Sequence, residues 1–242
     1  MSLLRISRSR ARLVCAIILS VSGAFAATRG AAAVPSNGAS QIVLPIADAA
    51  ALLALPLTTE SPFDGPRQDF QTSLPACADA ADVGTPRIFG RPDLTSFHGS
   101  LLRDDSEDGR HIVKQAVGVF GSSAAAAAAQ GELITRTAAC LKAQSLAARE
   151  DDTTSGSAGK DWTFVNMNAA ADRISWRKVE NQENGWQCGL VSQAQDNALL
   201  QALVCERTPP PKGPATELLN AMVARIPQAA PELPAPEPAP TS

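Results

Sequence analysis

The stretch from Trp186 to Arg207 has apolar residues on both sides of the polar pair Asp196-Asn197. This pattern predicts a β-hairpin whose two loop residues are Asp196 and Asn197, with one apolar face. Cys188 and Cys205 then face each other at a non-hydrogen-bonded pair, where the short distance between the strands suits a disulfide. The hairpin is therefore expected to close the domain with a covalent cross-link.

Four more strands are predicted from period-two patterns and β-branched residues. The polar segment DDSEDG joins the first two of them as the long loop of another hairpin. The predicted strands are residues 97–103, 111–120, 162–167 and 173–179, and residues 144–149 are a possible further strand.

Three helices are predicted from helical spacing, N-cap residues and alanine content. The first is expected to be buried, because apolar residues extend nearly around it. The segments 57–76 and 86–92, which contain several prolines, are expected to be irregular. The predicted helices are residues 44–55, 121–143 (with Cys140 in its last turn) and 215–226, with a helical turn at 77–82.

This order of elements predicts an α+β fold, with a mainly antiparallel sheet covered by helices. The folded region is expected to be one domain and to span residues 41–227. Residues 27–40 are expected to form a flexible leader, and the Pro-rich tail 228–242 is expected to be disordered.

The N-terminal residues 1–26 have the pattern of a secretory signal peptide. Four arginines precede the apolar run Leu13–Val21, and Ala24-Phe25-Ala26 gives a small-residue cleavage site. A second run of small residues at 31–33 leaves the cleavage position open, and retention as an anchor is the alternative. We expect a secreted, extracytoplasmic protein of the cell envelope.

Cleavage changes the charge and the cysteine count of the chain. Loss of four arginines takes the formal net charge from −3 to −7, which disfavours binding to nucleic acid or anionic lipid. Loss of Cys15 leaves Cys77, Cys140, Cys188 and Cys205, which can pair in three ways. The hairpin register favours Cys188–Cys205 and leaves Cys77–Cys140, although free or differently paired cysteines are the alternative.

No catalytic, cofactor or metal motif is present in the sequence. His98 and His111 are interpreted as exposed or hydrogen-bonded strand residues, because a metal site needs more converging ligands. Residues 118–123 lack the lysine of a P-loop, so a strand-to-helix turn is favoured over an anion site.

Two further groups of residues have both a functional and a plain interpretation. Asp104, Asp105, Glu107 and Asp108 could suggest calcium, but their spacing differs from that of an EF-hand, and a solvated acidic loop is favoured. The tryptophans are interpreted as core residues, with a ligand platform as the alternative. These are Trp162, Trp176 and Trp186.

Taken together, these stretches resemble the extracellular sensor domain of mycobacterial PknH-type serine/threonine kinases and related secreted proteins and lipoproteins. The resemblance rests on LPACADAA, QAVGVFGSSAAAAAA, KDWTF and the hairpin CGLVSQAQDNALLQALVC. It implies two disulfides, an α+β fold with a groove or cleft, and an unidentified ligand. Only the four cysteines carry over residue by residue; no kinase domain is present, and residues 135–139 lack the tryptophan often found there in the family.

Three functions follow as hypotheses. The first is a non-enzymatic, sensor-like domain, presumed monomeric, that binds a small molecule or an envelope component without a cofactor. The second is a structural or protein-interaction module of the envelope, with the Pro-rich tail as a spacer. The third is a hydrolase with an unrecognised site, which requires a histidine or a carboxylate pair beside a nucleophile in a pocket.

Overall fold

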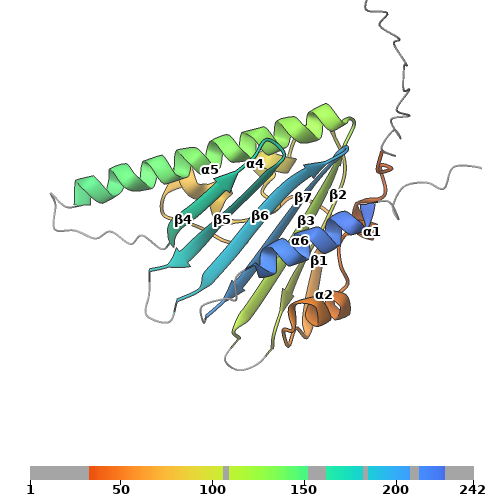
Figure 1. Cartoon of the computed structure of the whole chain (residues 1–242), viewed down its shortest axis with the longest axis horizontal. Coiled ribbons are helices and arrows are strands. Elements are labelled where there is room, and N and C mark those ends of the chain that lie inside the picture. The colour runs from red at the N-terminus through yellow and green to blue at the C-terminus, as the bar shows by residue number, and fades with distance from the viewer. Residues whose placement is uncertain (1–32, 106–108, 152–161, 182–184, 208–212, 227–242) are drawn as a thin grey trace, which may run out of the picture. The chain divides into compact units, whose positions relative to one another are not determined.

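Among the residues that the computed structural model describes (33–105, 109–151, 162–181, 185–207 and 213–226), seven strands form one antiparallel sheet (Figure 1). Their spatial order is β1-β2-β3-β7-β6-β5-β4, so the last strand in sequence lies in the centre. The strands are β1 (Thr59–Phe63), β2 (Leu94–Arg103), β3 (His111–Phe120), β4 (Trp162–Ala169), β5 (Arg173–Glu180), β6 (Gln187–Gln195) and β7 (Ala198–Glu206).

The hairpin of β6 and β7 has the predicted register. Gln195 pairs with Ala198 and Cys188 with Cys205, and the two cysteines form a disulfide. Asp196 adopts a left-handed conformation (φ 52°) in the turn, which an aspartate tolerates better than most residues. The Asn197 side chain then holds the N-terminal segment, because its amide accepts from the Val34 N–H at 2.8 Å and donates to the Val34 carbonyl.

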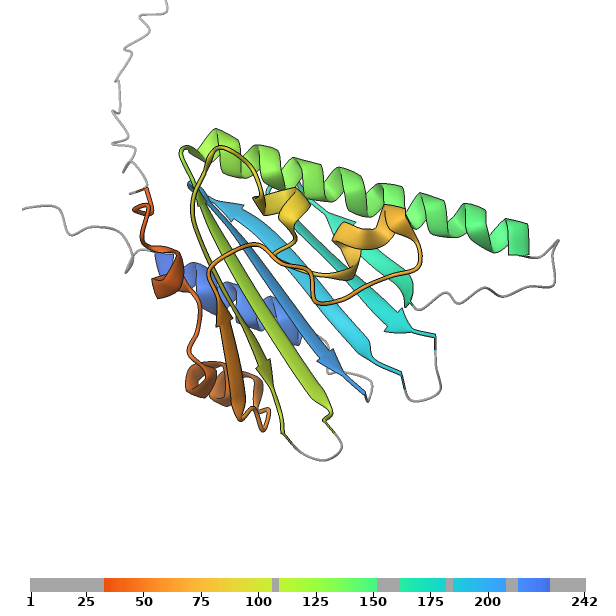
Figure 2. The ribbon, with the colours of Figure 1, turned by 180° about the vertical axis from the view of Figure 1, so that it is seen from behind.

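One face of the sheet packs against the long helix α5 (Ser123–Asp151), as Figure 2 shows. The short elements η1 (Pro75–Cys77), α3 (Ala78–Ala81) and α4 (Pro86–Phe89) lie on the same face. Buried alanines of α5, Ala126 and Ala129, belong to this core, since small side chains allow close approach to the strands. A second disulfide, Cys77–Cys140, joins η1 to α5, so both predicted pairings are confirmed.

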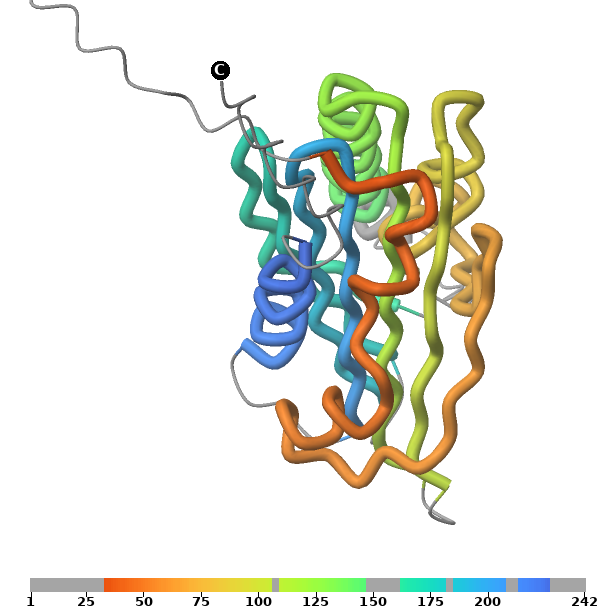
Figure 3. The backbone as a smooth tube through the Cα atoms, turned by 90° about the vertical axis from the view of Figure 1, so that its right-hand side faces the viewer, coloured from red at the N-terminus to blue at the C-terminus, as the bar shows by residue number. Residues whose placement is uncertain are grey.

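The opposite face packs against α1 (Ala39–Ile42), α2 (Ile46–Leu53) and α6 (Pro214–Ala224). The view in Figure 3 shows α6 and the turns α3 and α4 on opposite sides of the sheet. Two separate apolar clusters therefore fill the space above and below the strands. The α+β prediction is confirmed.

The helix α5 is longer than the sequence pattern indicates. It continues to Asp151, so the predicted end near residue 143, the position of Cys140 in the last turn and the possible strand at 144–149 are wrong. The extension contains good helix formers, and Gln144 links it to the sheet edge. The Gln144 amide donates to the Phe164 carbonyl at 3.1 Å and accepts from the Phe164 N–H at 2.7 Å, as a neighbouring strand would.

Four smaller differences also have local causes. The strand β1, which contains Pro62, lies at a sheet edge, where a residue without an N–H is tolerated. α4 forms inside the segment predicted to be irregular, with Pro86 at its first position. α2 is not buried all round, since Leu52 is 41% exposed. Ordered structure begins before residue 41, because Val34 is packed on the hairpin turn.

The predicted signal peptide 1–26, the first part of the leader and the Pro-rich tail 228–242 lie outside the described residues.

Candidate functional site

The face that carries α6 is covered by helices over only part of its width. α6 packs on β6 and β7, while none of the described helices covers β4 and β5 on this side (Figure 1). Side chains alternate along β5, so Ile174, Trp176 and Lys178 enter the core on the α5 side. Ser175 and Arg177 therefore project from the uncovered side.

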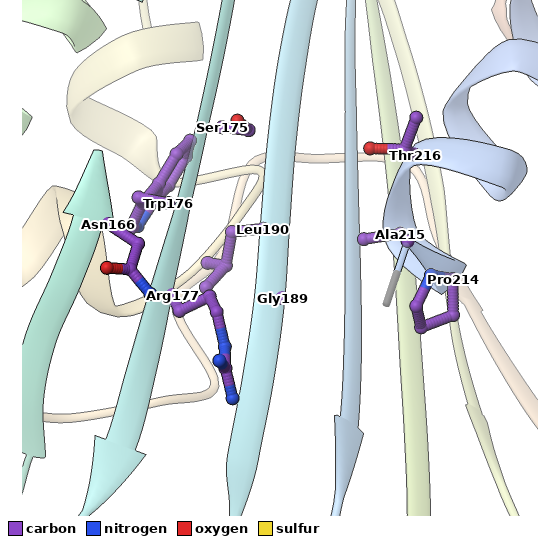
Figure 4. Close-up of a pocket in the computed structure, with 10 residues that line it drawn as sticks. Asn166, Ser175, Trp176, Arg177, Gly189, Leu190, Pro214, Ala215 and Thr216 are labelled. Carbon is purple, nitrogen blue, oxygen red and sulfur yellow. The ribbon is translucent and has the colours of Figure 1, made fainter. Parts of the chain in front are cut away.

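A groove lies between this uncovered part of the sheet and the first turn of α6 (Figure 4). Its volume is about 340 Å³, which lies near the lower end of the range of small-molecule sites. Its lining comes from four separate segments of the chain. The lining residues are Asn166, Ser175, Trp176, Arg177, Gly189, Leu190, Gly213, Pro214, Ala215 and Thr216.

Two glycines shape the groove. A Cβ atom built on Gly189 would lie 3.6 Å from the Ala215 Cβ, which is ordinary van der Waals contact, so larger side chains at position 189 would extend into the space. Gly213 precedes α6 with φ 108°, a conformation that side chains rarely adopt. Pro214 then begins the helix with a suitable φ, and this turn sets the position of the α6 wall.

Asn166 reaches the groove because β4 contains a β-bulge. The pairing with β5 shifts between Val165 and Asn168, and Asn166 has φ 55°. Asparagine is one of the few residues with a side chain that adopt this conformation readily, and bulges commonly redirect a side chain. Figure 4 shows Asn166 and Arg177 on the sheet side of the groove, with the start of α6 opposite.

Among the described residues that line the groove, Arg177 is the one that is ionisable. One of its Nη atoms donates to the Gln187 side-chain oxygen at 2.9 Å. Arg173, on the same face, instead donates to Gln193 and to Asn220 of α6, and it does not line the groove. The groove therefore offers a positive charge, amide and hydroxyl groups, and a small apolar wall.

The α5 side of the sheet contains a buried charged network. Lys114 donates to Asp82 at 2.8 Å and to Asp69 at 2.9 Å, and its side chain is fully buried. Lys178 donates to the Ala81 carbonyl at 2.5 Å, and its ammonium group lies 3.4 Å from the centre of the Phe70 ring.

Burial lowers the pKa of Lys178 well below its usual value of 10.5, although the nearby Asp82 charge opposes this shift. A lysine of lowered pKa is a candidate nucleophile or base. Its side chain has no solvent access, however, so the network fixes the segment from Asp69 to Asp82 onto the sheet instead of presenting a reactive amine.

The two histidines each pair with one aspartate. His98 contacts Asp64 at 2.7 Å, and His111 contacts Asp104 at 2.5 Å. Burial raises the pKa of Asp104, but hydrogen bonds from His111 and Arg110 outweigh burial and leave the pKa below its usual value. Among the described residues, no serine, threonine or cysteine is hydrogen-bonded to either ring, so the geometry gives no support to the hydrolase hypothesis.

The remaining candidates are structural where they are described. Gly118 has no side chain because a Cβ there would lie 2.5 Å from the Phe89 ring, and Ser122 caps α5 by accepting from the Ala125 N–H. Trp176 is a core residue that donates to the Ala80 carbonyl at 2.8 Å. In the part of the chain that the structure describes, no three His, Cys, Asp or Glu side chains are arranged to hold a metal ion.

Of the groove residues, sequence analysis identified only Trp176, whose indole lies on the other face of the sheet. Two signals were present in the sequence: an asparagine inside a strand, at 166, and a glycine inside a strand, at 189. Each typically marks a bulge or a close approach. Neither indicates that α6 lies beside them.

Comparisons with known proteins agree on one family. A profile described as PknH-like extracellular domain matches residues 34–225. The crystal structure of the extracellular domain of PknH from Mycobacterium tuberculosis is similar in fold, with a TM-score of 0.62 at 17% sequence identity. The alignment covers 82% of this chain and 100% of that one. A search of curated protein sequences gave no significant match. Within the described residues, no helix is long and apolar enough to cross a membrane.

Proposed function

Because the chain belongs to the family of PknH-like extracellular domains, we propose that it binds a small ligand in the groove beside α6, without catalysing a reaction. The family consists of extracellular domains, so this domain lies outside the cytoplasm. Its two disulfides suit that location, since disulfides persist in oxidising compartments.

The groove itself is the observation that carries the proposal. It combines the apolar surface of Pro214 and Ala215 with a few polar groups from β4 and β5, which is the usual composition of a small-molecule site. It lies on the hydrogen-bonded sheet, in which the hairpin disulfide joins β6 to β7. Such a site can hold a ligand without rearrangement of its walls.

The absence of a catalytic role is proposed from the geometry of the reactive groups. The histidines lie on β2 and β3, and each pairs with an aspartate in an adjoining loop. Neither histidine lines the groove. The lysine of lowered pKa is buried on the opposite face of the sheet. Among the described residues, no pair of titratable side chains therefore lines the groove.

The test is native mass spectrometry of the exported protein, purified from its own host, in three forms. Gly189→Leu fills the groove floor, whereas Gly189→Ala adds one methyl group that the space beside Ala215 accepts. The wild-type protein and Gly189→Ala should carry a bound small-molecule mass, and Gly189→Leu should lose it. As a control, a cooperative thermal unfolding transition in all three forms should show that each is folded. No bound mass on the wild-type protein, or equal retention by Gly189→Leu, contradicts the proposal.

A further inference from the structure

We infer that the ligand of this groove carries an anionic group, a carboxylate or a phosphate, that binds Arg177. This inference rests on the proposed function and adds the chemical class of the ligand. It follows from the charge of the lining, from the partners of the arginines and from the position of α6.

Among the described residues, the lining has one positive charge and no negative charge. Of the ten described residues that line the groove, only Arg177 is ionisable, although the protein as a whole has an excess of acidic residues. A guanidinium group binds a carboxylate or phosphate through two parallel hydrogen bonds. A cationic ligand at the same position would be repelled by the positive charge of Arg177.

The partner of Arg177 distinguishes it from the arginines of the domain that form ion pairs. Arg91 and Arg136 bind Glu132, and Arg225 binds Asp48. Arg177, in contrast, donates to the neutral amide of Gln187 and has no carboxylate partner among the described residues. Since a guanidinium has five N–H donors, Gln187 orients Arg177 and leaves donors for a ligand.

The opposite wall adds donors of its own. α6 has 11 residues, and no side chain caps its N-terminus, so the N–H groups of Ala215 and Thr216 have no partner within the helix. The helix dipole favours negative charge at this end. The Ser175 and Thr216 hydroxyls and the Asn166 amide also line the space. Glu217, in the same turn, is exposed and is not part of the lining.

The groove volume and its apolar wall indicate that the anion is part of a larger molecule. Inorganic phosphate would occupy a small part of about 340 Å³ and would not contact Pro214 productively. A small organic acid or phosphate ester would place its charged group on Arg177 and its carbon skeleton along Pro214 and Ala215. The inferred ligand class is therefore a small organic anion.

The experiment compares a charged with a neutral probe of the same shape, and an organic phosphate with inorganic phosphate, on the exported protein. Benzoate is compared with benzamide, and phenyl phosphate with inorganic phosphate, by following the backbone amide signals of Gly189 and Ala215 in NMR titrations. Arg177→Gln removes the proposed partner. Arg173→Gln is the matched control, because it removes an arginine of the same strand and face that does not line the groove.

Benzoate and phenyl phosphate should shift the groove signals of the wild-type protein and of Arg173→Gln. Arg177→Gln should weaken their binding at least about tenfold, as expected for loss of a charge-assisted hydrogen bond, and higher salt should weaken wild-type binding. Equal binding of benzamide and benzoate, or no loss in Arg177→Gln, overturns the anion inference and leaves the groove as a ligand site. If no probe shifts the groove signals, the anion inference fails, and native mass spectrometry of the Gly189 variants decides the proposed function separately.

Discussion

Asp82→Asn removes one charge from the buried network on the α5 side while keeping the shape of the side chain. The Asp82 carboxylate accepts from Lys114 at 2.8 Å and from the backbone N–H groups of Asp69 and Val83 at 2.6 and 2.8 Å. An asparagine replaces one of these acceptor oxygens with an NH₂ group that faces other donors. The substitution also leaves the fully buried Lys114 ammonium without its fully buried partner.

The expected loss of stability follows from this geometry. Breaking a buried ion pair by removing one partner costs about 3–5 kcal/mol. Asp69 still contacts the same ammonium at 2.9 Å, so we expect the lower end, about 3 kcal/mol. This is a large fraction of the typical free energy of unfolding of a domain, about 5–15 kcal/mol.

Urea unfolding at neutral pH, with the disulfides intact, measures this loss. Trp176 fluorescence is a suitable signal, because its indole contacts the carbonyl of Ala80 next to the network. Asp69→Asn is the control, since the Asp69 side chain is 27% exposed and exposed pairs contribute about 1 kcal/mol or less. The reasoning is refuted if Asp82→Asn loses under about 1 kcal/mol, or if both variants lose the same amount.

Three further predictions concern the disulfides, the buried lysine and the sheet edge. Replacing Cys77 and Cys140 by alanine should destabilise the domain more than removing the hairpin disulfide. The first disulfide closes a loop of 63 residues and the second a loop of 17 residues, so chain entropy predicts contributions to stability of about 4 and about 3 kcal/mol, respectively. The opposite order of the two losses in urea unfolding would contradict this. The folded protein releases the Lys178 proton below the usual pKa of 10.5, so the unfolded chain binds more protons between the two pKa values and stability rises with pH there. The stability gain of Lys178→Met over the wild-type protein should therefore shrink from neutral pH to about pH 9.5, and a constant difference in unfolding free energy would refute this. Gln144→Ala should free the backbone groups of Phe164 at the β4 edge and promote edge-to-edge pairing, which sedimentation velocity would detect as dimers absent from the wild-type protein.

The strand pairing of the C-terminal half could be predicted because its signals are local. In β6 and β7 the facing apolar residues, the two-residue turn and the cysteine positions all agree on one register. β1 has no such agreement, since Pro62 and Glu60 interrupt any apolar alternation. It is a strand because β2 offers it an edge, which is tertiary information.

The end of α5 and the groove could not be predicted for related reasons. Beyond residue 143 the helix continues through propensity and through the Gln144 contact with β4, not through an apolar stripe that a pattern would reveal. The groove combines residues 166, 175–177, 189–190 and 213–216. Its shape depends on where α6 crosses the sheet, and no short sequence window contains that position.

The central position of β7 has a consequence for how the protein is made. All nine residues of this strand are buried, and it joins the β1–β3 half of the sheet to the β4–β6 half. A chain that leaves the cytoplasm N-terminus first delivers Ala198–Glu206 after the other six strands of the sheet. The two halves cannot join before then, and their exposed edges are prone to pair wrongly. Folding of this sheet is therefore completed only after all seven strands have been exported, and any chaperone that assists it outside the cytoplasm must hold an incomplete sheet until β7 arrives.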